Sequence, residues 1–315
     1  IVLRDGVFRP QMLRPPEDAA RPPPPRPMQA AFRVEVGNIS VHGVVIQRLS
    51  CRIAMRGLGL DVQEVNARIG ETPSEGGAGG EPDNLEGRFS YERDAALLKG
   101  DVETFFDPRI LKPVLHAQDR QDQIRFVDRF EFPGRPPRIS CTFARRLEGG
   151  REFRLTGQGA AENVKYKGVS VLRADAGVAI REVGEETTCR VAPLLVVRPE
   201  GLARVEFSIF PERERVEFSG TSTMDPRALS RLIGVPTNRW AEALRLEGPI
   251  AISLEGTADT SGAGRHDFTG TVRGRGIGYG RIVTAEFRSD VRVRANTNVF
   301  ENVRGRIFGT EFEGD

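Results

Sequence analysis

The chain resembles itself at a spacing of about 115–120 residues. The motif Asp107–Leu111 (DPRIL) recurs as Asp225–Leu229 (DPRAL), 118 residues later. The segment Val65–Ile69 resembles Val303–Ile307 at a spacing of 238, which is twice 119. Repetition of this kind is typical of extended arrays, in which each repeat contacts its neighbours and a continuous surface carries the function. The repeat therefore argues against a fold built around one pocket.

Most of the chain alternates apolar and polar residues in short runs, as in Phe32, Val34 and Val36. A period of two, broken by glycine or charged turns, indicates strands with one buried face. Beyond residue 69, where such runs first end, the pattern predicts strands over 85–91, 96–104, 137–146, 151–158, 161–167, 169–182, 186–193, 202–210, 214–222, 248–257, 266–274, 276–283, 284–295 and 299–308. We therefore expect a mainly β fold, a long antiparallel meander.

Helices are predicted where the DPR motif occurs. Asp107 is a suitable N-cap and Pro108 suits the first helical position, so a helix should run to about His116, followed by a second over 119–130. In the second copy, Asp225 would cap a helix that stops at Gly234, with a partner near 238–246. The sequence thus predicts one short helix pair in each repeat.

These elements predict four segments: a Pro-rich linker or partial strand over 1–30, a first repeat over 31–130, a second repeat over 131–246 and a truncated third repeat over 247–315. The first two repeats would each end in a helix pair. The density of proline over 10–27 favours a polyproline II spacer over an SH3-type ligand, and 71–83 is predicted to be a flexible loop. With no initiating Met and a strand pattern still running at the C-terminus, we expect the chain to be part of a longer protein.

Composition limits the class of function. Hydrophobic residues make up 38% of the chain, below the roughly 45–50% of typical globular proteins, which indicates a thin apolar layer. The net charge of +2 provides no global field to attract nucleic acid. We therefore expect no nucleic-acid partner.

Catalytic and metal-binding motifs are missing from the sequence. His42, His116 and His266 lie in unrelated elements without a second metal ligand at useful spacing. The glycines of 273–280 mimic a nucleotide loop, but they lie within a predicted strand meander. Cys51, Cys141 and Cys189 suit buried strand positions, although one bridge, Cys51–Cys141 or Cys141–Cys189, stays open in an oxidising compartment. We expect no enzyme activity, no cofactor and no metal.

Three recurring pieces resemble the AsmA-like family of bacterial envelope proteins, which includes TamB and YhdP-type members. One is a strand in which glycine precedes apolar positions, as in Lys167-Gly168-Val169 and Tyr279-Gly280-Arg281-Ile282. Another is an amphipathic strand ending in glycine, as in Phe218-Ser219-Gly220. The third is the capped DPxxL helix that follows. Together they cover residues 30–315.

The resemblance implies a twisted antiparallel sheet curled into an open trough with an apolar inner face, part of a bridge-like lipid transfer protein. It implies phospholipids or other acyl lipids as partners, and a periplasmic location in a parent anchored to the inner membrane. It gives no catalytic residue. The inward apolar positions, which would line the lipid groove, are Val34, Val36, Ile53, Met55, Phe89, Phe153, Leu155, Val178, Ile180, Val205, Phe207, Ile209, Val216, Phe218, Ile250, Ile252, Leu254, Phe268, Phe287, Val291 and Val293.

Three alternatives stay open. The apolar faces would also suit packing on another sheet or on the helices, as in a sandwich. A structural or adhesive β-repeat protein without a hydrophobic ligand would show the same alternation. A glycan-active β-domain would need a cleft lined by aromatic side chains and two facing carboxylates, and Trp240 is the single Trp of the chain.

Overall fold

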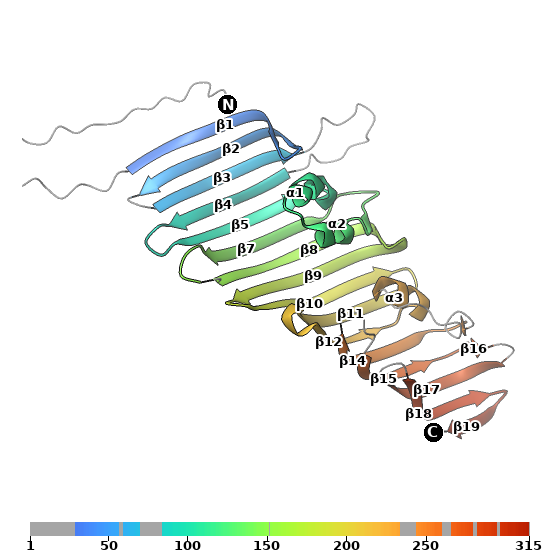
Figure 1. Ribbon diagram of the computed structural model, residues 1–315. Coiled ribbons are helices and arrows are strands. Elements are labelled where there is room, and N and C mark those ends of the chain that lie inside the picture. The colour runs from blue at the N-terminus through green and yellow to red at the C-terminus, as the bar shows by residue number, and fades with distance from the viewer. Residues whose placement is uncertain are drawn as a thin grey trace, which may run out of the picture. The chain divides into compact units, whose positions relative to one another are not determined.

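The fold is mainly β, as predicted. The structure, a computed structural model (Figure 1), describes residues 29–56, 59–69, 84–150, 152–233, 244–259, 266–279, 282–294 and 297–314. Of these residues, 73% lie in strands, which pair in a large antiparallel sheet that is not closed into a barrel. The chain divides into two units, one of residues 1–125 and 136–155 and the other of residues 126–135 and 156–315. We call them unit 1 and unit 2, and each is described by itself.

Unit 1 is a ladder of consecutive antiparallel strands. Each strand pairs with the next in the order β1-β2-β3-β4-β5-β7. The helical segment lies between β5 and β7 in the sequence. The strands are β1 (Gln29–Val41), β2 (Val44–Arg56), β3 (Gly59–Ile69), β4 (Asn84–Glu92), β5 (Leu97–Phe105) and β7 (Arg138–Arg146). The predicted loop over 71–83 and the Pro-rich segment lie outside the described residues.

Unit 2 continues the same construction. Its ladder runs β9-β10-β11-β12-β14-β15-β17-β18-β19, and β17 also pairs with β16, which pairs with β13. The strands are β6 (Phe130–Glu131), β8 (Glu152–Tyr166), β9 (Val169–Val183), β10 (Glu186–Arg198), β11 (Gly201–Phe210), β12 (Arg215–Ser222), β13 (Leu244–Leu246), β14 (Ile250–Asp259), β15 (His266–Gly274), β16 (Ile277–Tyr279), β17 (Ile282–Arg294), β18 (Thr297–Ile307) and β19 (Thr310–Gly314). β6 pairs with β8, whose first four residues belong to unit 1.

The prediction of a helix pair in every repeat is not supported. The first pair exists, as α1 (Lys112–Ala117) after a 3₁₀ turn η1 (Pro108–Leu111), and α2 (Gln121–Val127). In the second copy, α3 (Pro226–Ile233) forms as predicted, and a 3₁₀ turn η2 (Pro211–Arg213) precedes β12. Of the partner predicted near 238–246, residues 238–243 lie outside the described residues, and 244–246 form β13 instead of a helix.

Several strands are longer than the pattern suggested. The alternation in β3 predicts one apolar run that ends at Val62 and a second that begins at Val65, and the strand joins them through Glu64, whose φ of 51° is left-handed. The register shifts there, between Val62 and Val65, so that both residues stay on the same side of the ladder. One extra residue in a bulge restores the facing of the strand after it. The change from even to odd apolar positions after Val62 was therefore a bulge and not a strand end.

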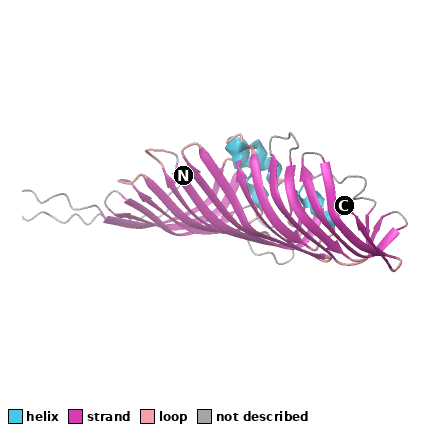
Figure 2. Ribbon diagram, turned by 90° about the horizontal axis from the view of Figure 1, so that it is seen from below, coloured by secondary structure: helices cyan, strands magenta, loops and turns pink. Residues whose placement is uncertain are grey.

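The core of unit 1 lies where the helices meet the ends of the strands. Val44, Ala67, Ile69 and Phe106 form a buried cluster, against which Ile110, Leu111 and Val114 of the helical segment pack. In unit 2, Met224, the residue before the Asp225 cap, is fully buried. Figure 2 shows the strands of each unit as a single layer, with helices near strand ends. Burial is therefore concentrated at one end of the strands, and the rest of the sheet is one layer thick.

Candidate functional site: the apolar sheet faces

The register of unit 2 places apolar side chains in rows that cross the strands. Directly opposed residues of antiparallel strands point to the same side of a sheet. One row contains Val178, Val191, Phe207, Phe218, Gly256, Phe268 and Val293, and the next contains Ile180, Cys189, Ile209, Val216 and Ala258. A third contains Ala176, Leu194, Val205, Gly220, Leu254, Gly270, Val291 and Phe300. We call these rows, with Ile250, Ile252 and Phe287 on the same side, the apolar face of unit 2.

Unit 1 has a corresponding face. Its rows contain Val36, Leu49, Ala67 and Leu85; Val34 and Cys51; Ile53, Val62, Phe89, Gly100 and Phe143; and Met55, Leu60, Tyr91 and Leu98. We call this the apolar face of unit 1. The helical segment covers one end of it, because Leu49 and Leu85 pack against the buried cluster of Phe106.

The predicted groove residues are distributed over these faces. Every predicted position in β1, β2 and β4 lies on the apolar face of unit 1, and every predicted position from β9 onward lies on that of unit 2. Phe153 and Leu155 lie two residues apart on β8 and are half-buried. Ile250, Ile252 and Val293 are buried, whereas the other predicted residues are half-buried. Half-burial is expected of side chains that touch their neighbours in a sheet and have nothing packed above them.

No second layer of described residues lies over the middle of either face. The described elements in close contact are ladder neighbours and turns, together with α3 against β9. Figure 2 shows one layer of strands in each unit, whereas a sandwich would stack two layers about 10 Å apart. Within the described residues, each face is thus an open apolar surface.

Glycines alternate with large side chains on both faces. Gly100 lies between Phe89 and Phe143, whose ring centroids are 6.1 Å apart. Gly256 lies between Phe218 and Phe268, with ring centroids 5.9 Å apart. A side chain at Gly100 would meet both rings, whereas one at Gly256 would meet the backbone of Asp267 and Phe268. At both positions glycine is therefore the residue that fits.

The opposite side of each ladder is charged. Cross-strand ion pairs join Arg88 to Asp101 at 2.6 Å and Arg190 to Glu206 at 3.6 Å, and Arg138 also pairs with Glu103. These side chains are largely exposed, so each pair contributes about 0–1 kcal/mol to stability. The sheet is therefore amphipathic, with solvent-exposed charges behind each apolar face.

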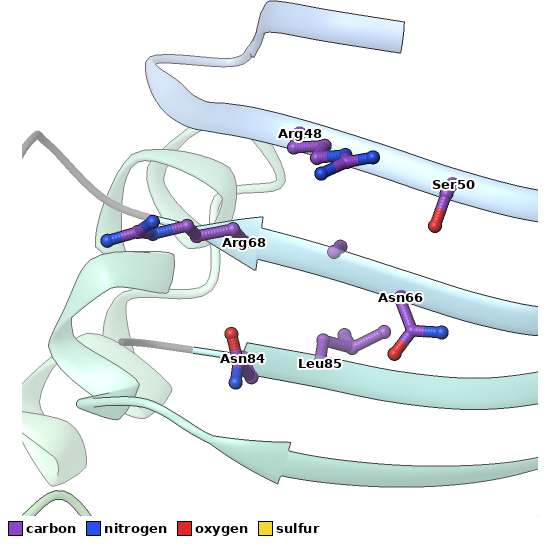
Figure 3. Close-up of a pocket in the computed structure, with 7 residues that line it drawn as sticks. Arg48, Ser50, Asn66, Arg68, Asn84 and Leu85 are labelled. Atoms are coloured by element: carbon purple, nitrogen blue, oxygen red, sulfur yellow. The ribbon is translucent and has the colours of Figure 1, made fainter. Parts of the chain in front are cut away.

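A shallow pocket of about 200 Å³ lies on unit 1 between β2, β3 and β4 (Figure 3). Arg48, Ser50, Asn66, Arg68 and Asn84 provide its polar lining. Figure 3 shows the guanidinium groups of the two arginines pointing in opposite directions along their strands. The donors do not converge, and the pocket has no arrangement suited to catalysis.

All three cysteines lie on the apolar faces and are free thiols. The structure thus contains neither disulfide that the sequence left open. Burial raises the pKa of the Cys51 and Cys189 thiols, and burial together with the nearby charge of Asp101 raises that of Cys141. The thiols are therefore protonated at neutral pH and behave as small apolar side chains.

The predicted set missed several members of the same rows. Phe143 on β7, Val191 and Leu194 on β10, and Val62 on β3 complete the faces. The alternation that selected their neighbours contains the same signal for Val62 and Phe143. Leu194 was harder to find, because the register shift between Val191 and Leu194 breaks the period of two.

No family model, curated protein or solved structure matches this chain. Among the described helices, none has the length and apolar character required to cross a membrane.

Proposed function

We propose that this chain guides the acyl chains of phospholipids along its apolar faces, as part of an AsmA-like envelope protein in the periplasm whose parent is anchored to the inner membrane. The observation that carries the proposal is the apolar face of unit 2. Two of its three rows continue from β9 to β17 without a charged side chain among their directly opposed positions. A face of this kind offers continuous contact to a hydrocarbon chain that moves across the strands.

The energetics favour such a use. Burying an acyl chain of 16 carbons gains roughly 13 kcal/mol, at about 0.8 kcal/mol per methylene. A lipid moving through water would forfeit this gain. An uninterrupted apolar surface removes this cost at every step of the movement. The apolar faces would line a groove, and the lipid head group would stay in water at its rim.

The test is photo-crosslinking with a phosphatidylcholine that carries a diazirine in its acyl chain. Phe207 and Phe218 are directly opposed at the centre of the apolar face of unit 2. We expect the double variant F207D/F218D to lose most of the crosslinking, because two carboxylates there place charge in the path of the hydrocarbon.

The matched control is S208D/S219D. Ser208 and Ser219 are the next residues along the same two strands and face the charged side. This variant adds the same charge to the same strands and should crosslink like the unaltered chain. Circular dichroism would confirm the strand content of both variants, and F207S/F218S would replace the carboxylate variant if that one fails to fold.

Unchanged crosslinking in a folded F207D/F218D would refute the assignment of the groove. Native mass spectrometry of the purified chain gives a second measurement, in which we expect co-purified phospholipid. A chain free of lipid that also fails to crosslink would favour a structural or adhesive β-repeat protein.

A further inference from the structure

The charged side of β15, β17, β18 and β19 in unit 2 contains two neighbouring rows of opposite character. In the first, which we call the alternating row, Glu286 opposes Arg306, which opposes Glu311. Arg275 lies 3.7 Å from Glu286, and Arg306 lies 3.1 Å from Glu311. Each cation of the alternating row therefore has a carboxylate.

The second row, which we call the arginine row, places three cations in succession. Arg273 opposes Arg288, which opposes Arg304, and Glu313 stands next to Arg304 in the adjacent strand. The carboxylate of Glu313 lies 2.7 Å from the guanidinium of Arg304. Among the described residues, neither Arg273 nor Arg288 has an ion pair or a side-chain hydrogen bond, and both are exposed.

The carboxylates that flank Arg288 on β17 are bound to other groups. Glu286 pairs with Arg275, and Asp290 accepts a hydrogen bond of 2.8 Å from the amide of Asn302. The arginine row thus has two adjacent positive charges that the surrounding side chains leave uncompensated.

This pair differs from the other directly opposed arginines of the described ladders. Arg33 opposes Arg52 and Arg48 opposes Arg68, but Glu35 lies within 3.3 Å of Arg33 and 3.9 Å of Arg48. In each of these pairs at least one arginine has a carboxylate. Only Arg273 and Arg288 face each other with none in the described part of the chain.

Like charges directly opposed in a sheet are destabilising. Neighbouring strands lie about 4.8 Å apart, so two guanidinium groups can approach one oxyanion from adjacent strands. Their planar forks match the oxygens of a phosphate group bidentately. We propose that Arg273 and Arg288, assisted by Arg304, bind a phosphate group, either of a soluble phosphate or of a phosphomonoester lipid head group.

This site is separate from the proposed acyl-chain path. Arg273 alternates with Val272, and Arg288 alternates with Phe287, so the arginines point away from the apolar face. Phosphate binding therefore stands or falls without the proposed function.

The test is thermal unfolding in phosphate buffer against chloride at equal ionic strength and pH 7.5. Inorganic phosphate at about ten times its Kd should raise the Tm by roughly 2–3 °C. The variant R288E converts the arginine row to alternating charge. We expect its Tm in chloride to exceed that of the unaltered chain, and its phosphate-dependent rise to fall at least fourfold.

Phosphate also stabilises proteins in general, because it is excluded from their surfaces. The control variant R306Q distinguishes this general effect from binding at the arginine row. This variant breaks an ion pair of the alternating row and should lower the Tm in chloride while keeping the full rise in phosphate. An equal rise in R288E and in the unaltered chain would overturn the site, as would no rise in either.

Vesicles distinguish the two sources of phosphate. Flotation would compare phosphatidylcholine vesicles with and without about 20 mol% phosphatidic acid, a composition that presents phosphomonoesters at the surface. Binding that requires phosphatidic acid and disappears in R288E would assign a lipid head group. A phosphate-dependent Tm rise without flotation would assign a soluble phosphate.

Discussion

Units 1 and 2 contain the same two structural devices but differ in what covers the ends of their strands. Both have a DPR cap: the backbone N–H of Arg109 donates to Asp107 at 2.9 Å, and that of Arg227 donates to Asp225 at 2.8 Å. In each cap the guanidinium closes on the same carboxylate, at 2.5 Å in unit 1 and 2.6 Å in unit 2. Both units also have a glycine between two phenylalanines on the apolar face. After the cap of unit 1 the chain forms α1 and α2, the last two residues of α2 belonging to unit 2, whereas a single described α-helix, α3, follows the cap of unit 2.

The comparison separates what the repeated motif determines from what its surroundings determine. Aspartate, proline and arginine fix the start of a helix wherever they occur, because the interactions lie within three residues. The residues after the cap need apolar neighbours to pack against. Ile110, Leu111 and Val114 have a buried cluster to pack against in unit 1. The motif is therefore a local device for beginning a helix at one end of an apolar face.

The buried residue before each cap offers the largest test of this parallel. Phe106 is 5% exposed and Met224 is 0% exposed. If both anchor the caps, F106A should lower the free energy of unfolding by about 3–5 kcal/mol and M224A by about 2–5 kcal/mol, from lost burial and the cavity left behind. Urea denaturation followed by circular dichroism would measure both.

Leu172→Ala provides the control, because Leu172 is 47% exposed and should change stability by under about 1 kcal/mol. If M224A lowers the free energy of unfolding by less than about 1 kcal/mol, the two caps are not anchored in the same way. Only the cap of unit 1 would then depend on the buried residue before it.

The sequence sufficed for features that depend on local chemistry. Alternation predicted most of the strands, and the DPR motif predicted both caps, because each signal is complete within a few residues. The helix pair predicted for the second copy is not supported, since residues 244–246 of its expected partner pair with β16 through contacts more than 30 residues away, which no local pattern reveals. The arginine row was also hidden, because opposition of Arg273 and Arg288 depends on the register of two strands. Register follows from the whole ladder and not from either strand alone.

The glycines between phenylalanines test whether the apolar faces are built alike. A Cβ added to Gly100 would lie 2.7 Å from ring atoms of Phe89 and Phe143, which can rotate away. A Cβ added to Gly256 would overlap the backbone oxygen of Asp267, which cannot move without the strand. We expect both G100A and G256A to lose about 1–3 kcal/mol of stability, with the greater loss in G256A. Thermal or urea unfolding would rank them.

Gly134→Ala is the matched control, because a Cβ there meets nothing within 4 Å. It should leave the free energy of unfolding unchanged within about 0.5 kcal/mol. Equal losses in all three variants would show that the losses do not come from close packing around Gly100 and Gly256.

The smallest effect is the response of the Asp225 cap to pH. Burial alone would raise the pKa of Asp225, but hydrogen bonds from the Arg227 side chain and backbone, with the charges of Arg227 and Arg198, hold this pKa below its ordinary value. A carboxyl whose pKa is lowered by folding stabilises the folded state above the pKa of the unfolded chain, about 3.9. That contribution disappears as the pH falls through the lower pKa of the folded state.

We expect D225A to lower the free energy of unfolding by about 1 kcal/mol at pH 7. The difference in this free energy between D225A and the unaltered chain should shrink below about pH 4. A difference that stays constant from pH 7 to pH 2.5 would show that Asp225 acts through its shape and not through its charge, and D107A measured over the same range would show whether the cap of unit 1 behaves in the same way.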